Sequence, residues 1–251
     1  IKEAKSEIIN FGRFTDGSNV TEAKLGETFS QWLDGRAVFV FQTKQWLIWN
    51  GSVWSEDECG LMNKLAYQFI SEAKEALFGS GKHSAAGNLS SFESLNRLEN
   101  LCKLASTDRA VSLSNFDTDP MLLAAPNQWV DLKSGAAYDP DPSILISKAI
   151  ATDFCSRSEC PNFEAFVNDI FEGDQDLISY VQRAIGYSLT GSTNEQCLFI
   201  LIGDGANGKS TFVNVISKLL GDYSKAAASQ TLIARGSTSV GDDLVDLVGA
   251  R

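Results

Sequence analysis

The chain has 251 residues, of which 43% are hydrophobic and 21% are charged, a balance typical of a soluble globular protein with room for two modest domains. No apolar run reaches the length of a membrane span and no signal peptide opens the chain, so we expect no membrane partner. The first residue is Ile1 rather than Met, which indicates a fragment of a longer protein. The formal net charge is −11, which argues against a broad electrostatic grip on nucleic acid, so any DNA contact is expected to be local or to come from residues beyond this chain.

The N-terminal part, residues 1–125, is predicted to be an α+β domain. In chain order the expected elements are a helix at 22–33, strands at 37–41, 46–49 and 53–54, a helix at 61–78, a loop at 79–91 and a helix at 92–105. His83 is expected in the loop as a solvated side chain rather than as a catalytic base. The strands are rich in aromatic residues, which we interpret as a packed core, with a platform for base stacking as the alternative.

A linker with short strands is expected at 126–160, followed by a helical part. Strands are predicted at 121–123 and 129–132, and helices at 163–171 and 177–189, the second of which is capped by Asp174. The acidic residues of this region are interpreted as helix ends and caps rather than as a metal site; they are Asp169, Glu172, Asp174 and Asp176.

The cysteines do not suggest a disulfide framework. There are five of them, and an odd number argues for free thiols in a reducing cytoplasm. Cys155 and Cys160 have a spacing that could form half of a zinc site. No second pair accompanies them and the single histidine is distant in sequence, so zinc is disfavoured.

The most informative stretch fits the phosphate-loop pattern G-x-x-x-x-G-K-[ST]: it reads Gly203, Asp204, Gly205, Ala206, Asn207, Gly208, Lys209, Ser210 and Thr211. Residues 197–202 before it are an unbroken apolar run, as expected for a parallel strand covered on both faces. Apolar residues at helical spacing follow the loop, and Gly221 is expected to end that helix. The order of strand, loop and helix predicts a nucleotide-binding site.

Each residue type has a physical reason to be there. Gly203 and Gly208 allow the backbone to approach phosphates closely, and Gly205 and Asn207 tolerate the left-handed conformation. A helix N-terminus offers unpaired N–H groups and a positive dipole end. Lys209 is expected to reach the β- and γ-phosphates of ATP as the catalytic cation, and the Ser210 hydroxyl to ligate Mg²⁺. Thr211 supports the start of the helix or is an ordinary helical residue.

Several stretches together resemble the phage/plasmid primase-helicase family, whose C-terminal module is a superfamily 3 helicase related to the poxvirus primase-helicase. The residues that carry this resemblance include 46–51, 116–117, 160–163, the phosphate loop, 221–223 and 249–251. Two departures are Gln128, where the family often has glycine, and Ser18, which interrupts a Thr-Asp-Gly-Asn motif.

The resemblance implies an α/β start of a P-loop AAA+ ATPase within 161–251, incomplete at Arg251 and preceded by a helical subdomain. It further implies an ATP-dependent DNA helicase that acts on single-stranded or forked DNA as a homo-hexamer, with a primase domain in cis or trans. The fragment alone is expected to hydrolyse ATP poorly, because the other residues of such a site lie beyond it. The alternatives are another P-loop NTPase, such as a GTPase or kinase, and a non-catalytic nucleotide-binding scaffold.

Overall fold

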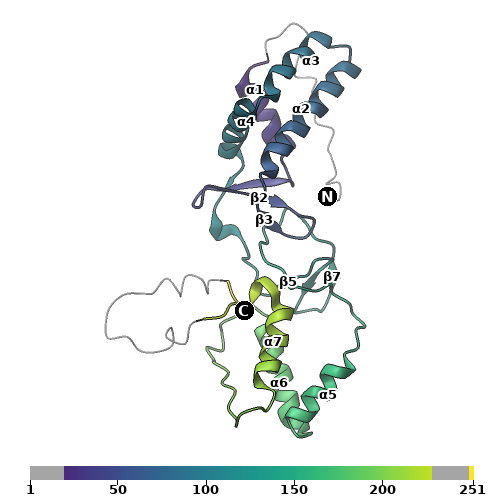
Figure 1. Cartoon of the computed structure of the whole chain (residues 1–251), viewed down its shortest axis with the longest axis vertical. Coiled ribbons are helices and arrows are strands. Elements are labelled where there is room, and N and C mark those ends of the chain that lie inside the picture. Colours follow the sequence, from purple (N-terminus) through teal and green to yellow (C-terminus); the bar gives the residue numbers. More distant parts are fainter. Residues whose placement is uncertain (1–19, 228–248) are drawn as a thin grey trace, which may run out of the picture. The chain divides into compact units, whose positions relative to one another are not determined.

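The computed structural model describes residues 20–227 and 249–251, which belong to two compact units (Figure 1). The first unit runs to Phe116 and includes 142–145, and the second holds 117–141 together with the residues from Ile146 onward. Both combine helices with a small sheet, so the fold is mixed α+β. The domain boundaries predicted near residues 125 and 160 stay predictions.

The first unit is built around four helices: α1 (Glu22–Trp32), α2 (Leu61–Gly79), α3 (His83–Leu89) and α4 (Leu95–Asp108), with a short 3-10 turn η2 (Ser90–Glu93) between the last two. Thr21 caps α1 by accepting a hydrogen bond from the Lys24 amide. The Asp57 carboxylate accepts from the first two amides of α2 at 2.6 and 3.0 Å. The helices bury a shared apolar core that includes Phe29 and Phe69.

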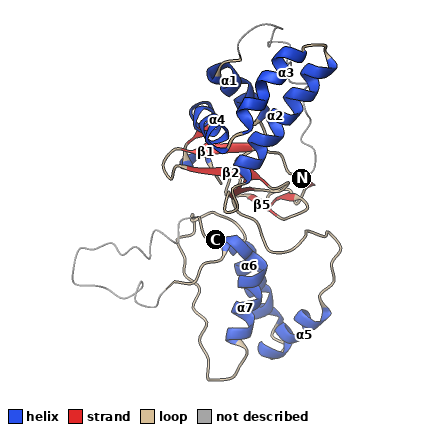
Figure 2. Ribbon diagram, turned by 45° about the horizontal axis from the view of Figure 1, so that its top comes forward, coloured by secondary structure: helices blue, strands red, loops and turns tan. Residues whose placement is uncertain are grey.

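Helices α1, α2 and α4 gather on one side of a four-stranded sheet with the order β3-β2-β1-β4 (Figure 2). The strands are β1 (Ala37–Val40), β2 (Gln45–Trp49), β3 (Trp54–Glu56) and β4 (Ala110–Val111). Side chains alternate between the two faces. Ala37 and Ile48 join the helical core, whereas Val38, Leu47 and Trp54 form a second cluster on the opposite face.

Most of the elements predicted for this unit are confirmed, including the hairpin and the helix that begins at Leu61. The loop predicted at 79–91 is wrong for its centre, because His83–Leu89 forms α3. Ala85, Ala86 and Leu89 are buried in the helical core, so their burial outweighs the loop-forming tendency of the surrounding glycine and serine. Among the aromatic residues of these strands, Trp54 is 2% exposed, in agreement with the packed-core interpretation, whereas Phe41 is 70% exposed.

The second unit contains a three-stranded antiparallel sheet, β5-β6-β7, and three longer helices. The strands are β5 (Leu122–Ala124), β6 (Trp129–Asp131) and β7 (Ala137–Tyr138), and the helices are α5 (Pro161–Ile170), α6 (Gln175–Ser188) and α7 (Lys209–Leu220), which leads into the 3-10 turn η4 (Gly221–Tyr223). Asp174 caps α6 as predicted, since its carboxylate accepts from the Asp176 and Leu177 amides.

The strand predicted at 197–202 is wrong for the structure described. These residues form no strand, and neither of the two sheets includes them. Their side chains are open to solvent, with Leu198 70% and Ile202 89% exposed. A strand needs neighbours that satisfy its backbone N–H and C=O groups, and the run has none in the part of the chain that the structure describes. The α/β arrangement of an AAA+ ATPase therefore stays a prediction.

The C-terminal end of α7 is fixed to the rest of its unit by Tyr223. The Tyr223 hydroxyl donates to the Lys148 carbonyl at 2.8 Å and accepts from the Ala124 amide at 3.4 Å. The Arg251 guanidinium lies 4.2 Å from the centre of the Tyr223 ring and donates to the carbonyls of Leu189 and Leu122, both at 2.7 Å. Burial lowers the pKa of Arg251 and raises the pKa of Tyr223.

Candidate nucleotide-binding site

The glycine-rich loop turns directly into α7, and Gly208 is the residue at the turn. Its φ of 83° is the left-handed conformation that favours glycine. A Cβ atom at this position would lie 2.7 Å from Ile170 Cγ2 and 3.3 Å from Phe166 Cε2, so α5 packs too closely for a side chain here. Both the backbone conformation and the close side chains of α5 therefore favour glycine at position 208.

The other residues of the loop behave differently from the expectation. The second left-handed residue is Ala206, with a φ of 60°, and neither Gly205 nor Asn207 adopts that conformation. A Cβ at Gly205 would meet nothing within 4 Å, whereas a Cβ at Gly203 would overlap Asn207 Nδ2. Within the loop, a side chain at position 203 would displace the Asn207 amide, a side chain at position 208 would press against α5, and position 205 is unconstrained.

The Lys209 ammonium curls back onto the loop that precedes it. Its Nζ donates to the carbonyls of Gly203 and Asp204 at 2.8 and 3.0 Å, and to Asn207 Oδ1 at 2.6 Å. Three oxygen atoms thus surround a single positive charge at the start of a helix. The loop is closed around the lysine, and phosphate oxygens could take over the same cation by exchange.

Ser210 and Thr211 occupy the first turn of α7, where backbone N–H groups have no partner within the helix. Both side chains are exposed. The donor set suits a magnesium-bound polyphosphate, because it combines a glycine cradle, one ammonium group, a hydroxyl and the positive end of a helix dipole. The nine predicted residues, Gly203 to Thr211, run from the loop into the first turn of α7.

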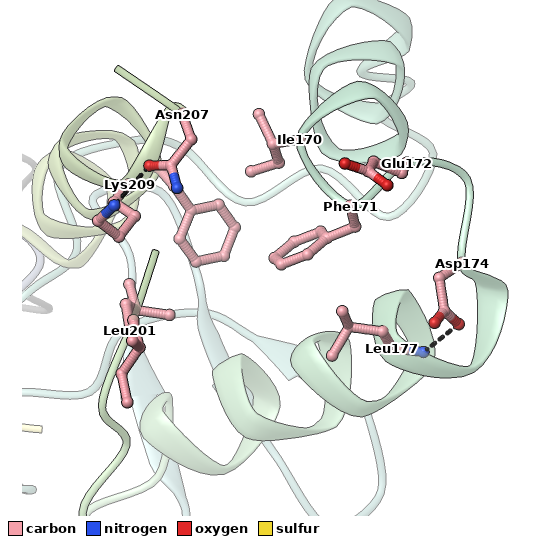
Figure 3. Close-up of a pocket in the computed structure, with 10 residues that line it drawn as sticks. Ile170, Phe171, Glu172, Asp174, Leu177, Leu201, Asn207 and Lys209 are labelled. Atoms are coloured by element: carbon pink, nitrogen blue, oxygen red, sulfur yellow. Dashed lines mark hydrogen bonds between the residues drawn. The ribbon is translucent and has the colours of Figure 1, made fainter. Parts of the chain in front are cut away.

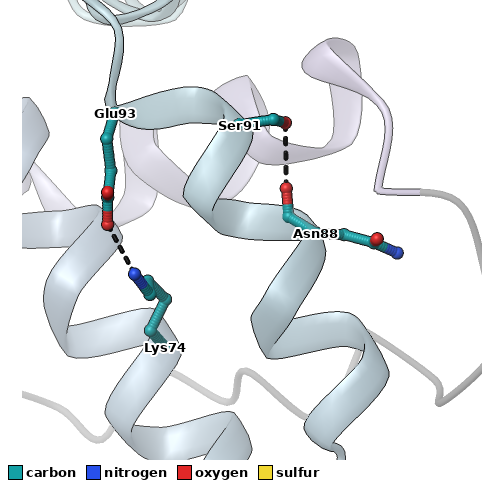
Figure 4. Close-up of polar contacts among 4 residues, drawn as sticks. All are labelled: Lys74, Asn88, Ser91 and Glu93. Carbon is teal, nitrogen blue, oxygen red and sulfur yellow. Dashed lines mark hydrogen bonds and ion pairs between the residues drawn. The ribbon is translucent and has the colours of Figure 1, made fainter.

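A pocket of about 450 Å³ lies beside this loop, between the α5–α6 corner and the start of α7 (Figure 3). Asn207 and Lys209 line it from the loop, and Ile170, Phe171 and Glu172 line it from the corner. The sequence motif does not include these corner residues. The spacing of Ile170 and Phe171 predicted only a helix, Glu172 was interpreted as part of a helix end, and nothing in the sequence alone shows that α5 ends against the loop.

The other sequence candidates do not form sites. No group of acidic, cysteine or histidine side chains within residues 20–227 and 249–251 could hold a metal ion. All five cysteines are free thiols. His83 starts α3, with its ring 5.5 Å from that of Phe78. None of the helices that the structure describes is long and apolar enough to span a membrane.

Comparison with known proteins gives two findings. A family model described as "D5 N terminal like" matches residues 26–172. A protein named "Putative helicase L207/L206" from Acanthamoeba polyphaga mimivirus is 28% identical over 145 residues, which is 55% of this chain and 15% of that protein. The family match ends before the glycine-rich loop, so the assignment of the loop rests on its own sequence pattern and geometry.

Proposed function

The chain belongs to the D5 N terminal like family, a primase-helicase-like family, and from this premise we propose that it is part of a replication helicase whose 203–211 loop binds ATP with Mg²⁺. The observation that carries the proposal is the loop itself. Gly208 turns the backbone into α7 in a left-handed conformation that favours glycine, and a Cβ there would press against the side chains of Ile170 and Phe166. Lys209 follows with its ammonium already among three loop oxygens.

The roles follow from the positions of these residues. The amides at the start of α7 would donate to phosphate oxygens, and Lys209 would exchange its loop carbonyls for the β- and γ-phosphates. Ser210 would hold the magnesium ion, which when bound neutralises charge on the phosphates. Positioning and charge neutralisation supply most of phosphoryl-transfer catalysis, so Lys209 would be the catalytic cation of this segment.

The partners belong to the same proposal. The family and the name of the mimivirus relative support DNA as a partner. The chain spans 15% of that relative, so DNA unwinding, a homo-hexamer and a primase domain in cis or trans are proposed for a whole protein. The net charge of −11 favours local contacts with single-stranded or forked DNA over a wide basic surface.

The test combines binding to this chain with turnover by the whole gene product. We expect Lys209→Ala to weaken ATP binding to this chain by about a hundredfold, and to abolish DNA-stimulated hydrolysis by the whole protein, because the phosphates lose the cation that pairs with them. Lys218→Ala is the matched control, since Lys218 is an exposed lysine in the last turn of the same helix. Equal ATP binding by the wild-type chain and both variants would refute the proposal.

The same titrations address the alternatives. A chain that binds GTP in preference to ATP would support another P-loop NTPase. Tight ATP binding without hydrolysis in the whole protein, with or without DNA, would support a nucleotide-binding scaffold.

A further inference from the structure

The side chains that line the pocket beside the loop change in charge and polarity from one end of the pocket to the other. Lys209 and Asn207 stand at one end, Ile170 and Phe171 line the middle, and the Glu172 carboxylate stands at the other end (Figure 3). The pocket is therefore cationic, then apolar and then anionic. Its volume of about 450 Å³ falls within the range of small-molecule sites.

A nucleotide presents the complementary order, with a polyphosphate, a flat ring and amino groups on that ring. We propose that this pocket holds the base of the nucleotide, with Phe171 stacking on the ring and Glu172 accepting a hydrogen bond from an amino group of the base. The inference rests on the proposed function and deepens it, because it assigns residues that recognise the base rather than the phosphates.

Phe171 is suited to stacking because its ring is held and half-buried. It stands at 85° to the buried Phe212 ring, with 6.1 Å between centroids, and Figure 3 shows it pointing into the pocket. Its amide donates to the Val167 carbonyl at 3.2 Å, which fixes the backbone at the end of α5. A ring restrained in this way loses little entropy when a base packs on it.

The two carboxylates at the far end of the pocket differ in what they already bind. Asp174 Oδ1 accepts from the Asp176 and Leu177 amides as the cap of α6. Glu172 is exposed, and its backbone has a φ of 52°. Its carboxylate accepts no hydrogen bond from the residues that the structure describes. An unpaired carboxylate attracts amino donors and repels phosphates, so it would orient the ligand with its base at this end.

The experiment measures binding of ATP, tripolyphosphate and purine riboside triphosphate to the full chain by calorimetry. Tripolyphosphate lacks the nucleoside, and purine riboside triphosphate lacks only the amino group. The variants are Phe171→Ala and Glu172→Ala. The matched control is Phe163→Ala, because Phe163 also contacts the Phe212 ring, with 6.3 Å between centroids, but does not line the pocket.

We expect wild-type chain to bind ATP at least about tenfold more tightly than tripolyphosphate, and Phe171→Ala to remove most of this preference without changing tripolyphosphate binding. Glu172→Ala should remove the preference for ATP over purine riboside triphosphate, and Phe163→Ala should keep both preferences. Equal binding of ATP and tripolyphosphate to wild-type chain, or parallel losses of both in Phe171→Ala, would overturn the base pocket alone. Failure of both ligands to bind wild-type chain would overturn the phosphate site as well.

Discussion

Helix α7 is held differently at its two ends. At the C-terminal end, Gly221 takes a φ of 54° where a Cβ would lie 2.8 Å from the Ala151 amide nitrogen. Tyr223 then places its hydroxyl between Lys148 and Ala124 beneath the Arg251 guanidinium. At the N-terminal end, Lys209 contacts only the oxygens of its own loop. The contacts of Gly221 and Tyr223 named here come from elsewhere in the unit, whereas the hydrogen-bond partners of the Lys209 ammonium come from its own loop.

This difference suits a helix whose N-terminus binds a ligand. A rigid distal end fixes the direction of the helix dipole and the position of the first turn, which lowers the cost of ordering when an anion binds. At the N-terminal end of α7, the Lys209 ammonium is held by hydrogen bonds that a phosphate could replace. Residues 221–223 and 249–251 therefore act in the structure as the anchor of the C-terminal end of α7.

The largest effect on the free energy of unfolding is expected from removing the Tyr223 side chain, which anchors the C-terminal end of α7. Tyr223 is 1% exposed, so Tyr223→Ala should lower the free energy of unfolding by about 3 to 5 kcal/mol through the cavity that it leaves. Tyr223→Phe removes only the hydroxyl and should cost about 1 kcal/mol. Urea unfolding followed by circular dichroism measures both. Equal and small losses in the two variants would show that the end of α7 is not anchored through this ring.

The glycines at the two ends should separate stability from binding. Gly221→Ala forces a Cβ against backbone atoms at a positive φ and should cost about 2 to 4 kcal/mol of folding stability. Its ATP affinity should remain that of the wild-type chain in the folded fraction. Gly208→Ala meets the movable side chains of Ile170 and Phe166, so it should cost about 1 to 2 kcal/mol.

Unlike Gly221→Ala, Gly208→Ala is expected to lose ATP affinity as well as folding stability. Displacing the loop from the α5 corner should weaken ATP binding by more than about tenfold. The contrast is checked by thermal unfolding with and without ATP. If Gly221→Ala lost ATP binding while Gly208→Ala kept it, ligand binding at the N-terminal end of α7 and anchoring at its C-terminal end would both be contradicted.

The sequence predicted the local elements of this region better than their packing. Capping by Asp174, the helix after Gly208 and its end at Gly221 follow from short-range chemistry, and all three are confirmed. The corner residues Ile170 and Phe171 could not be assigned to the site, because their proximity to Gly208 depends on how α5 packs. The role of Arg251 was also missed, since its partners Leu122 and Leu189 are distant in sequence.

The apolar run 197–202 also shows that local sequence predicts packing poorly, here because expected burial is not found. Its composition predicts a strand covered on both faces, because only burial normally justifies six successive apolar residues. The structure instead leaves Leu198 and Ile202 largely exposed. Local pattern therefore indicated that the run should be covered, but whether a neighbouring strand covers it depends on residues far from it in sequence.

The smallest effect on the free energy of unfolding is expected from substitutions within residues 197–202. Ile202→Ser changes a side chain that is 89% exposed, so it should alter the free energy of unfolding by less than about 0.5 kcal/mol. The matched substitution Ile150→Ser, in the cluster around Tyr223, should cost about 2 to 4 kcal/mol, because it removes buried apolar volume and buries a hydroxyl. Urea unfolding of both variants gives the comparison. A loss above about 1 kcal/mol for Ile202→Ser would mean that residues 197–202 are covered in solution, as their composition predicts. The N-terminal end of α7 would then be supported as firmly as its C-terminal end.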